Sequence, residues 1–244
     1  MLRSEVFLSI VIPAHNEAHR LPGTLDKVLA FLHTQPYAAE VLVVENGSQD
    51  DTWAIAQRYA RRSPLVRALR EEARGKGLAV RRGMLAARGC FRFMADADLS
   101  MPIEELPRFL PPQLTDFDIA IASREAPGAV RYHEPAYRHL LGRGFNWMVR
   151  LLALPGLQDT QCGFKCFRAE VAEDVFRYQT LMGMSFDVEV LFIARRRGYR
   201  IVEVPIPWYF NPDSRVHLVQ DSLRMAWDLL TIRWNAWQGR YDPP

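Results

Sequence analysis

The 244-residue sequence predicts an α/β fold in which helices flank a mostly parallel central sheet. Short apolar runs alternate with stretches of helical periodicity through residue 122, as in consecutive βαβ units. Three of the apolar runs end in polar clusters, and a glycine-flanked lysine precedes one of the helices. Because ligands of open α/β sheets bind beyond the carboxyl ends of the strands, these clusters predict a binding site at that edge.

The strands expected in the first half of the chain are Leu8–Ile12, Val41–Val44, Val66–Leu69, Phe91–Ala95 and Ile119–Ala122. The helices expected between them are Leu21–Thr34, Thr52–Arg61, Leu78–Ala87 and Ile103–Leu110. In the second half, periodicity predicts a strand at Ile201–Val204 and helices at Tyr137–Leu154, Phe186–Arg197 and Leu218–Trp237. Pro205, Pro207 and Pro212 predict that Trp208–Arg215 is an irregular loop.

Composition narrows the class of protein. The chain is 49% hydrophobic and 24% charged, which is ordinary for a globular protein, and its net charge of +3 is too small to argue for a nucleic-acid partner. Cys90, Cys162 and Cys166 form neither an even disulfide framework nor a zinc site with a nearby histidine pair. We therefore expect reduced thiols, as in a cytosolic protein.

The N-terminal residues and the length of the apolar runs bear on whether the chain enters a membrane. Met1–Glu5 is polar and the first apolar run stops at Pro13, so we expect no signal peptide. Nowhere do about 18 apolar residues follow one another, so we expect no membrane-spanning helix. These observations predict a cytoplasmic location for one domain over residues 1–244.

The most informative motif is Asp96-Ala97-Asp98, which follows the apolar run Phe91–Ala95. Two carboxylates two residues apart at the end of a strand point past the sheet edge toward the same side. Such hard oxygen ligands hold a divalent cation and leave its other positions for phosphate oxygens and water. The alternative is a pair of solvated turn aspartates, since aspartate is common where strands end.

Other polar clusters are expected at the same edge and favour the metal site over that alternative. Pro13-Ala14-His15-Asn16-Glu17 follows the first strand, and Glu45-Asn46-Gly47-Ser48 follows the second. Arg74-Gly75-Lys76-Gly77 opens a helix that is rich in small and basic residues.

In this order, the motifs resemble those of family 2 glycosyltransferases, which have the GT-A (Rossmann-like) nucleotide-sugar fold. Further matching motifs extend the resemblance over residues 8 to about 216: Ser123-Arg124, Asp159-Thr160-Gln161-Cys162-Gly163-Phe164-Lys165 and Ser214-Arg215-Val216. The chain is most similar to the polyprenyl-phosphate (dolichyl-phosphate) β-glucosyl- and mannosyltransferases. Gly75–Arg88 and Asp159–Phe167 resemble the dolichyl-phosphate glucosyltransferase branch in particular.

The resemblance implies a division of the single domain and a donor site. About residues 1–122 would bind the nucleotide sugar and about 123–217 the acceptor, before an amphipathic helix at about 218–239. Pro13, Ala14, Glu17, Asn46 and Lys76 would surround the nucleoside. The other residues expected in the nucleotide-sugar site are Asn16, Glu45, Gly47, Asp96, Ala97 and Asp98.

The same resemblance implies a metal cofactor, Mg²⁺ or Mn²⁺, which would act as a Lewis acid on the departing diphosphate. Asp98 is the expected direct ligand, and Asp96 either shares the metal or holds donor hydroxyls. Lys76 is expected at the phosphates or at the nucleoside. Its alternative is a surface lysine in a glycine turn.

One departure from the common family pattern bears on the nucleobase of the donor. Many relatives have Asp-Asp-Gly-Ser where this chain has Glu45-Asn46-Gly47-Ser48. An amide matches the adjacent N–H and carbonyl of uracil, whereas the paired N–H groups of guanine favour a carboxylate. If Asn46 meets the base, uridine is favoured over guanosine; if Glu45 meets it, no preference follows.

Asp159 and Gln161 resemble the acceptor-side motif, and Asp159 is the candidate general base of an inverting transferase. A phosphate monoester acceptor is already largely ionised at neutral pH, because its second pKa is about 6. The alternative is therefore that Asp159 orients the site. Arg124 and Arg215 are candidates for binding the acceptor phosphate and the donor diphosphate, since guanidinium groups match phosphate oxygens.

The C-terminal helix has apolar residues at helical spacing, interleaved with aromatic and basic ones: Trp227, Trp234, Trp237, Arg224 and Arg233. The pattern favours packing on the sheet with the tryptophans in the core, and the alternative is a helix at a membrane interface. Four further arginines are interpreted as solvated surface residues, with a basic face near anionic lipid as the alternative: Arg131, Arg138, Arg143 and Arg150.

The sequence therefore predicts an inverting, metal-dependent glycosyltransferase that moves glucose from UDP-glucose onto a polyprenyl phosphate, as a peripheral protein at the cytoplasmic membrane face. Three alternatives stay open: GDP-mannose as donor, a soluble or saccharide acceptor, and a nucleotide-sugar-binding protein without turnover. The presence of Asp96 and Asp98 argues against the last. A nucleotidyltransferase would carry a glycine-rich loop where this chain has Pro13–Glu17.

Overall fold

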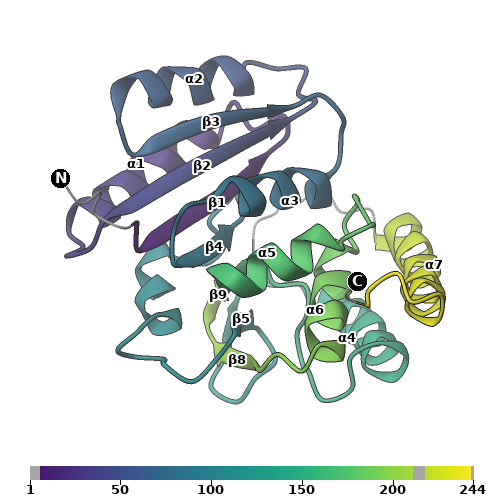
Figure 1. The fold of residues 1–244 in the computed structure, drawn as a ribbon. Helices are drawn as coiled ribbons and strands as arrows, with labels where there is room; N and C mark the ends of the chain where they lie inside the picture. Colours follow the sequence, from purple (N-terminus) through teal and green to yellow (C-terminus); the bar gives the residue numbers. More distant parts are fainter. Residues whose placement is uncertain (1–5, 211–217, 243–244) are drawn as a thin grey trace.

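The computed structural model describes residues 6–210 and 218–242, and a seven-stranded sheet lies at its centre (Figure 1). The strand order is β3-β2-β1-β4-β7-β5-β8. The strands are β1 (Leu8–Ala14), β2 (Ala39–Asn46), β3 (Val66–Glu71), β4 (Phe91–Ala95), β5 (Ile119–Ser123), β7 (Phe164–Arg168) and β8 (Ile201–Pro205). Adjacent strands are parallel except at β7, which is antiparallel to both β4 and β5. The predicted mostly parallel sheet is confirmed.

Helices cover both faces of the sheet because alternate strand residues point to opposite sides. One core holds Ile10, Ile12, Val41 and Val43 against α1 (Leu21–His33), α2 (Thr52–Arg62) and η1 (Ile103–Phe109). The other holds Val11, Leu42 and Val44 against α3 (Lys76–Ala86), α5 (Ala169–Arg177) and α6 (Phe186–Arg196). At one end of the molecule α4 (Ala136–Leu152) and α7 (Leu218–Trp237) lie beside each other (Figure 1).

Because β7 is antiparallel to its neighbours, the segment that precedes it lies at the same edge of the sheet as the carboxyl ends of the other strands. The carboxyl ends of β1, β2, β4, β5 and β8 lie at this edge, together with the amino end of β7. The segment Asp159–Gly163, which leads into β7, therefore reaches the same edge as Asp96–Asp98, which follows β4. The chain order of the strands also reverses here, between β1 and β4, where α/β sheets open a crevice for ligands.

Two of the predicted elements differ in the structure. Residues 103–109 form a 3₁₀-helix, because Pro107 within it has no N–H to donate. Pro207–Tyr209 is not irregular but forms a short strand, β9, paired in parallel with β6 (Val130–Tyr132). Proline is tolerated as the first residue of a strand, which explains the difference. The rest of the predicted loop, residues 211–215, lies outside the described residues.

The prediction that the tryptophans of the last helix fill the core is wrong. Trp227, Trp234 and Trp237 are 70%, 55% and 77% exposed. The helix packs instead through Leu229, Ile232 and Ala236, which are buried on its other side. Two apolar stripes run along α7, and periodicity alone does not tell which of them faces inward.

Within residues 6–210 and 218–242, no helix combines the length and the apolar character that crossing a bilayer requires.

Candidate active site

The loops after β1 and β2 are held together by hydrogen bonds. The Asn16 backbone N–H donates to Ser48 Oγ at 3.0 Å, and Asn16 Oδ1 accepts from the Gln49 N–H at 2.7 Å. The backbone N–H of Glu17 donates to Thr52 Oγ1 at 2.7 Å. Asn16 has φ +52°, a left-handed conformation that asparagine tolerates better than most residues. The two loops thus form a preorganised wall at the sheet edge.

Glu45 and Asn46 are adjacent in sequence but face different surroundings. Glu45 is 1% exposed; its Oε1 accepts from the Ser48 N–H at 2.5 Å, and its Oε2 lies 3.4 Å from Arg70 Nε. Gly47 has φ +65°, and a Cβ there would lie 3.2 Å from the Glu72 carbonyl oxygen. Asn46 accepts through its carbonyl oxygen from His15, whereas its side-chain amide has no hydrogen bond within the described part of the chain. Glu45 therefore shapes the loop, whereas Asn46, which is 3% exposed, has a side-chain amide that no described residue engages.

The acidic motif after β4 meets the lysine that opens α3. Lys76 Nζ lies 2.7 Å from Asp96 Oδ1 and 2.9 Å from Asp96 Oδ2. Burial would lower the pKa of Lys76, but the negative charge of Asp96 outweighs it and raises that pKa above its ordinary value. Lys76 is therefore an ammonium ion at this edge, and Asp96 is a carboxylate already engaged by it.

Asp98 is the less engaged carboxylate of the motif. Its Oδ1 accepts from the Ser100 N–H at 3.0 Å, and Leu99 between them has φ +44°, which is strained for a leucine. Thr24 Oγ1 donates to the Ala97 carbonyl at 2.5 Å and fixes the motif against α1. The described residues contain no group of three or more His, Cys, Asp or Glu side chains able to hold a metal. Two carboxylates fit a cation that takes its remaining ligands from diphosphate and water.

The segment before β7 packs directly against Asp96. The Asp96 N–H donates to the Gly163 carbonyl at 3.1 Å, and a Cβ on Gly163 would lie 1.9 Å from Asp96 Oδ2. A side chain at position 163 would force the Asp96 carboxylate to move, so Gly163 couples the two motifs.

Asp159 and Arg124 form a buried, bidentate ion pair. Asp159 is 2% exposed and accepts from Arg124 Nε at 2.6 Å, Arg124 Nη2 at 3.0 Å and the Arg124 N–H at 3.0 Å. The Gln161 N–H adds a bond of 3.2 Å. Burial would raise the pKa of Asp159, but the charge and hydrogen bonds of Arg124 lower it to about 2. A carboxyl with so low a pKa is a weak proton acceptor.

The structure brings the predicted residues into two groups at one edge. The first group, which was predicted to bind the nucleotide sugar, contains Pro13, Ala14, Asn16, Glu17, Glu45, Asn46, Gly47, Lys76, Asp96, Ala97 and Asp98. The second group, which was predicted to lie on the acceptor side, contains Arg124, Asp159 and Gln161. Arg215 lies outside the described residues, and its predicted role stays a prediction.

Comparison with known proteins gives the family. The family model described as Glycosyl transferase family 2 matches residues 9–176, more than half of the chain. The chain belongs to glycosyl transferase family 2. It is therefore a glycosyltransferase that uses a nucleotide sugar.

Curated relatives cover nearly the whole glycosyltransferase chain. It is 36% identical to a dolichyl-phosphate beta-glucosyltransferase of Trichomonas vaginalis, over 94% of this chain and 71% of the relative. Enzymes of the same name from Drosophila melanogaster and Homo sapiens are 37% and 34% identical, over 92% and 93% of this chain and 74% of each relative.

Solved structures confirm the GT-A fold. Glucosyl-3-phosphoglycerate synthase from Mycobacterium tuberculosis, in complex with Mn²⁺ and UDP-glucose, has a TM-score of 0.66 at 18% identity and covers 98% of this chain and 80% of its own. Mannosyl-3-phosphoglycerate synthase from Rubrobacter xylanophilus has a TM-score of 0.68 at 17% identity, covering 98% and 76%.

Several residues that support the site were missed from the sequence. Glu203 on β8 accepts from the backbone N–H groups of Gln158 and Asp159, both at 2.9 Å. Lys165 on β7 is buried and donates to Asp187 Oδ1 and to the Cys162 carbonyl. Burial raises the pKa of Asp187 despite the nearby Lys165 and Lys76 charges. A charged residue within an apolar strand, as at Glu203, was the signal that could have found them.

Acid should weaken the fold through Asp159. Its pKa is about 2 in the folded enzyme and about 4 for an aspartate in an unfolded chain. The ionised carboxylate therefore adds ~3 kcal/mol to the free energy of unfolding above about pH 4, and this is lost as the pH falls toward about 2. We expect urea unfolding to show a larger difference between wild type and Asp159→Asn at about pH 7 than at about pH 3.

Asp116→Asn is the matched control, because Asp116 pairs with Arg200 at an exposed site. Its effect should be small at both values of pH. A difference between wild type and Asp159→Asn that does not change with pH would contradict the assigned ion pair.

Proposed function

We propose that this enzyme transfers glucose from UDP-glucose to the phosphate of a polyprenyl phosphate such as dolichyl phosphate. The observation that carries the proposal is the similarity over more than nine-tenths of the chain to enzymes named dolichyl-phosphate beta-glucosyltransferases. The two groups of residues at one sheet edge support it, because transfer needs donor and acceptor side by side. A lipid acceptor would bring the enzyme to a membrane surface, and we propose that this is the cytoplasmic face.

Uridine is favoured as the base because Asn46, rather than Glu45, has a side chain left for a ligand. The Glu45 carboxylate is committed to its own loop and to Arg70. The Asn46 amide has one donor and one acceptor face, as the adjacent carbonyl and N–H of uracil require.

Mg²⁺ or Mn²⁺ would be held by Asp98 and share Asp96 with Lys76. When bound, the cation supplies Lewis-acid stabilisation of the negative charge that grows on the leaving diphosphate. We assign Lys76 the same role, since it opens α3 and its ammonium lies 2.7 Å from Asp96 Oδ1. Pro13, Ala14, Asn16, Glu17 and Gly47 complete the wall around the nucleotide.

In the reaction, a phosphate oxygen of the acceptor forms a bond to the anomeric carbon of glucose, and the bond from that carbon to the UDP oxygen breaks. UDP-glucose carries an α-linked sugar, so a β-linked product requires inversion. The attacking oxygen arrives ionised and no proton has to be removed. We assign Asp159 to positioning, because Arg124 holds it as a carboxylate of low pKa.

Arg124 is the acceptor-side cation of the proposal. Nε and Nη2 of Arg124 donate to Asp159, and the Arg124 guanidinium lies 5.4 Å from the centre of the Trp208 ring. Nη1 has no hydrogen bond to another described residue and is free to donate to a phosphate oxygen. Gln161 is placed beside this pair by its bond to Asp159.

Loss of Asp98 should abolish transfer. Asp98→Ala removes the freer carboxylate at the diphosphate, and we expect kcat/KM for transfer of labelled glucose from UDP-glucose to a polyprenyl phosphate to fall about 10³-fold or more. The matched variant Asp116→Ala, at an exposed position, should keep full activity. Circular dichroism should show that both variants are folded; an active, folded Asp98→Ala enzyme would refute the metal assignment.

The choice of base should depend on Asn46. Asn46→Asp replaces an amide donor with a second acceptor, so kcat/KM for UDP-glucose should fall ~10-fold or more while GDP-glucose is used relatively better. Glu45→Gln is the control, because Glu45 points into its loop and its loss should not change the ratio of the two donors. A changed ratio in Glu45→Gln with none in Asn46→Asp would reverse the assignment.

A further inference from the structure

Two adjacent helices carry exposed apolar stripes that the catalytic site does not use. On α7, Trp227, Leu230, Trp234 and Trp237 follow a spacing of three and four residues and are all more than half exposed. On α4, Trp147 and Leu151 are 66% and 65% exposed. The two helices contact each other at one end of the molecule (Figure 1). Exposed apolar patches of this kind mark interaction surfaces.

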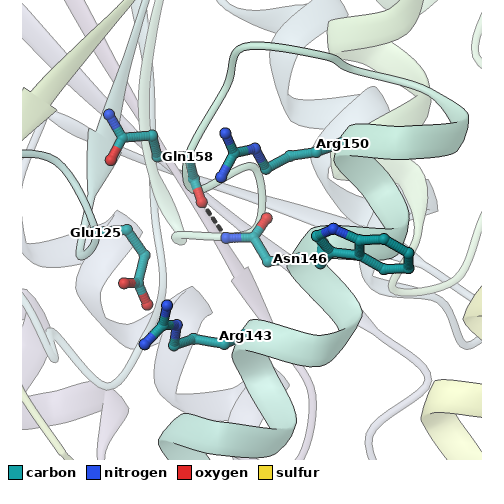
Figure 2. Close-up of a pocket in the computed structure, with 6 residues that line it drawn as sticks. Glu125, Arg143, Asn146, Arg150 and Gln158 are labelled. Atoms are coloured by element: carbon teal, nitrogen blue, oxygen red, sulfur yellow. Dashed lines mark hydrogen bonds between the residues drawn. The ribbon is translucent and has the colours of Figure 1, made fainter.

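A basic pocket opens beside the α4 stripe. Its volume is about 270 Å³, and its lining includes Arg143, Asn146 and Arg150 from one side of α4. Figure 2 shows these three side chains extending toward Gln158 and Glu125. Asn146 donates to the Gln158 carbonyl, which fixes the helix against that segment. Arg143 and Arg150 have neither an ion-pair nor a hydrogen-bond partner among the described residues.

Two residues that line the pocket are sequence neighbours of the ion pair between Arg124 and Asp159. Gln158 precedes Asp159, and Glu125 follows Arg124. Glu125 also lines the pocket and forms an ion pair with Arg131, so the lining has two arginines and one carboxylate. The pocket is thus a positively charged recess one residue away from the proposed acceptor site.

The basic residues and tryptophans of the two helices indicate which kind of partner this surface binds. Ala136–Leu152 contains three arginines and no acidic residue, so α4 carries the net positive charge. On α7, Arg224 and Arg233 are exposed, but the sequence of that helix also contains Asp221 and Asp228. Tryptophan prefers the boundary between hydrocarbon and water, where its ring is buried and its N–H meets polar groups. Basic residues beside such rings are attracted to anionic lipid.

Resting on the proposed function, we propose that the exposed stripes of α4 and α7 lie on an anionic lipid bilayer, with Arg143 and Arg150 binding a lipid phosphate in the pocket. The helices thereby hold the acceptor side against the surface from which a polyprenyl phosphate comes. The proposal takes up the alternative interpretation of Arg143 and Arg150, a basic face near anionic lipid, in preference to solvated surface residues.

The test is sedimentation of the full chain with vesicles, without UDP-glucose. The wild type should bind vesicles containing phosphatidylglycerol more tightly than vesicles of phosphatidylcholine alone. Arg143→Gln with Arg150→Gln should weaken binding to the anionic vesicles roughly 30-fold, the equivalent of about 1 kcal/mol for each arginine. Combined Trp227→Ser, Trp234→Ser and Trp237→Ser should weaken binding to both kinds about 10-fold or more.

Matched controls lie elsewhere on the molecule. Arg61→Gln with Arg62→Gln removes the same charge from α2, and Leu85→Ser removes an exposed apolar residue from α3. Both should bind like wild type. Because the tryptophans are exposed, the triple variant should keep the wild-type circular dichroism spectrum.

Absence of vesicle binding by the wild type, or equal loss in the control variants, would overturn the proposal. So would self-association that the tryptophan variant abolishes without any binding to vesicles, because the stripes would then be a subunit interface. Transfer to a short, water-soluble polyprenyl phosphate is measured without vesicles. Failure there refutes the proposed function and leaves the vesicle result standing, so the two failures are distinguishable.

Discussion

The buried ion pair between Arg124 and Asp159 holds together the part of this glycosyltransferase that we propose binds the acceptor. Arg124 follows β5, Asp159 precedes β7, and Glu203 on β8 holds the backbone of Gln158 and Asp159. The pair therefore ties three strands at the edge where donor residues also lie. A carboxylate as buried as Asp159 is tolerated only when it is paired and hydrogen-bonded, and four hydrogen bonds from Arg124 and Gln161 meet that condition.

The donor side is coupled to this pair by a close contact rather than by charge. Gly163 lies against Asp96, four residues after Asp159, and a side chain there would displace the Asp96 carboxylate. Asp96 in turn holds Lys76 at the start of α3. A displacement of the segment before β7 would therefore move the carboxylates of both Asp159 and Asp96. The buried pair of Lys165 and Asp187 anchors the same segment from beneath.

The sequence predicted the loops that follow β1, β2 and β4 because their signals are local. Strands that end in polar residues identify the loops containing Asn16, Asn46 and Asp98 without knowledge of the fold. The acceptor side depends on β7, whose Lys165 and Arg168 interrupt the apolar run and conceal a strand. Its antiparallel insertion between β4 and β5 is a long-range pairing that no local pattern contains. The last helix was misread for a related reason, since both of its sides carry apolar residues and only packing shows which is inside.

A nucleophile that arrives ionised changes what the protein has to supply. Positioning and charge stabilisation then replace proton abstraction, and Asp159 with its low pKa fits that requirement better than the role of a base. The most direct measurement is the pH dependence of kcat/KM for glucose transfer by wild type and Asp159→Asn. We predict an acid limb near pH 6, set by the acceptor phosphate, in both enzymes, with a uniform loss of about 10-fold in the variant. An acid limb that disappears in Asp159→Asn, together with a loss of about 10² or more, would show that Asp159 is the general base and contradict the account.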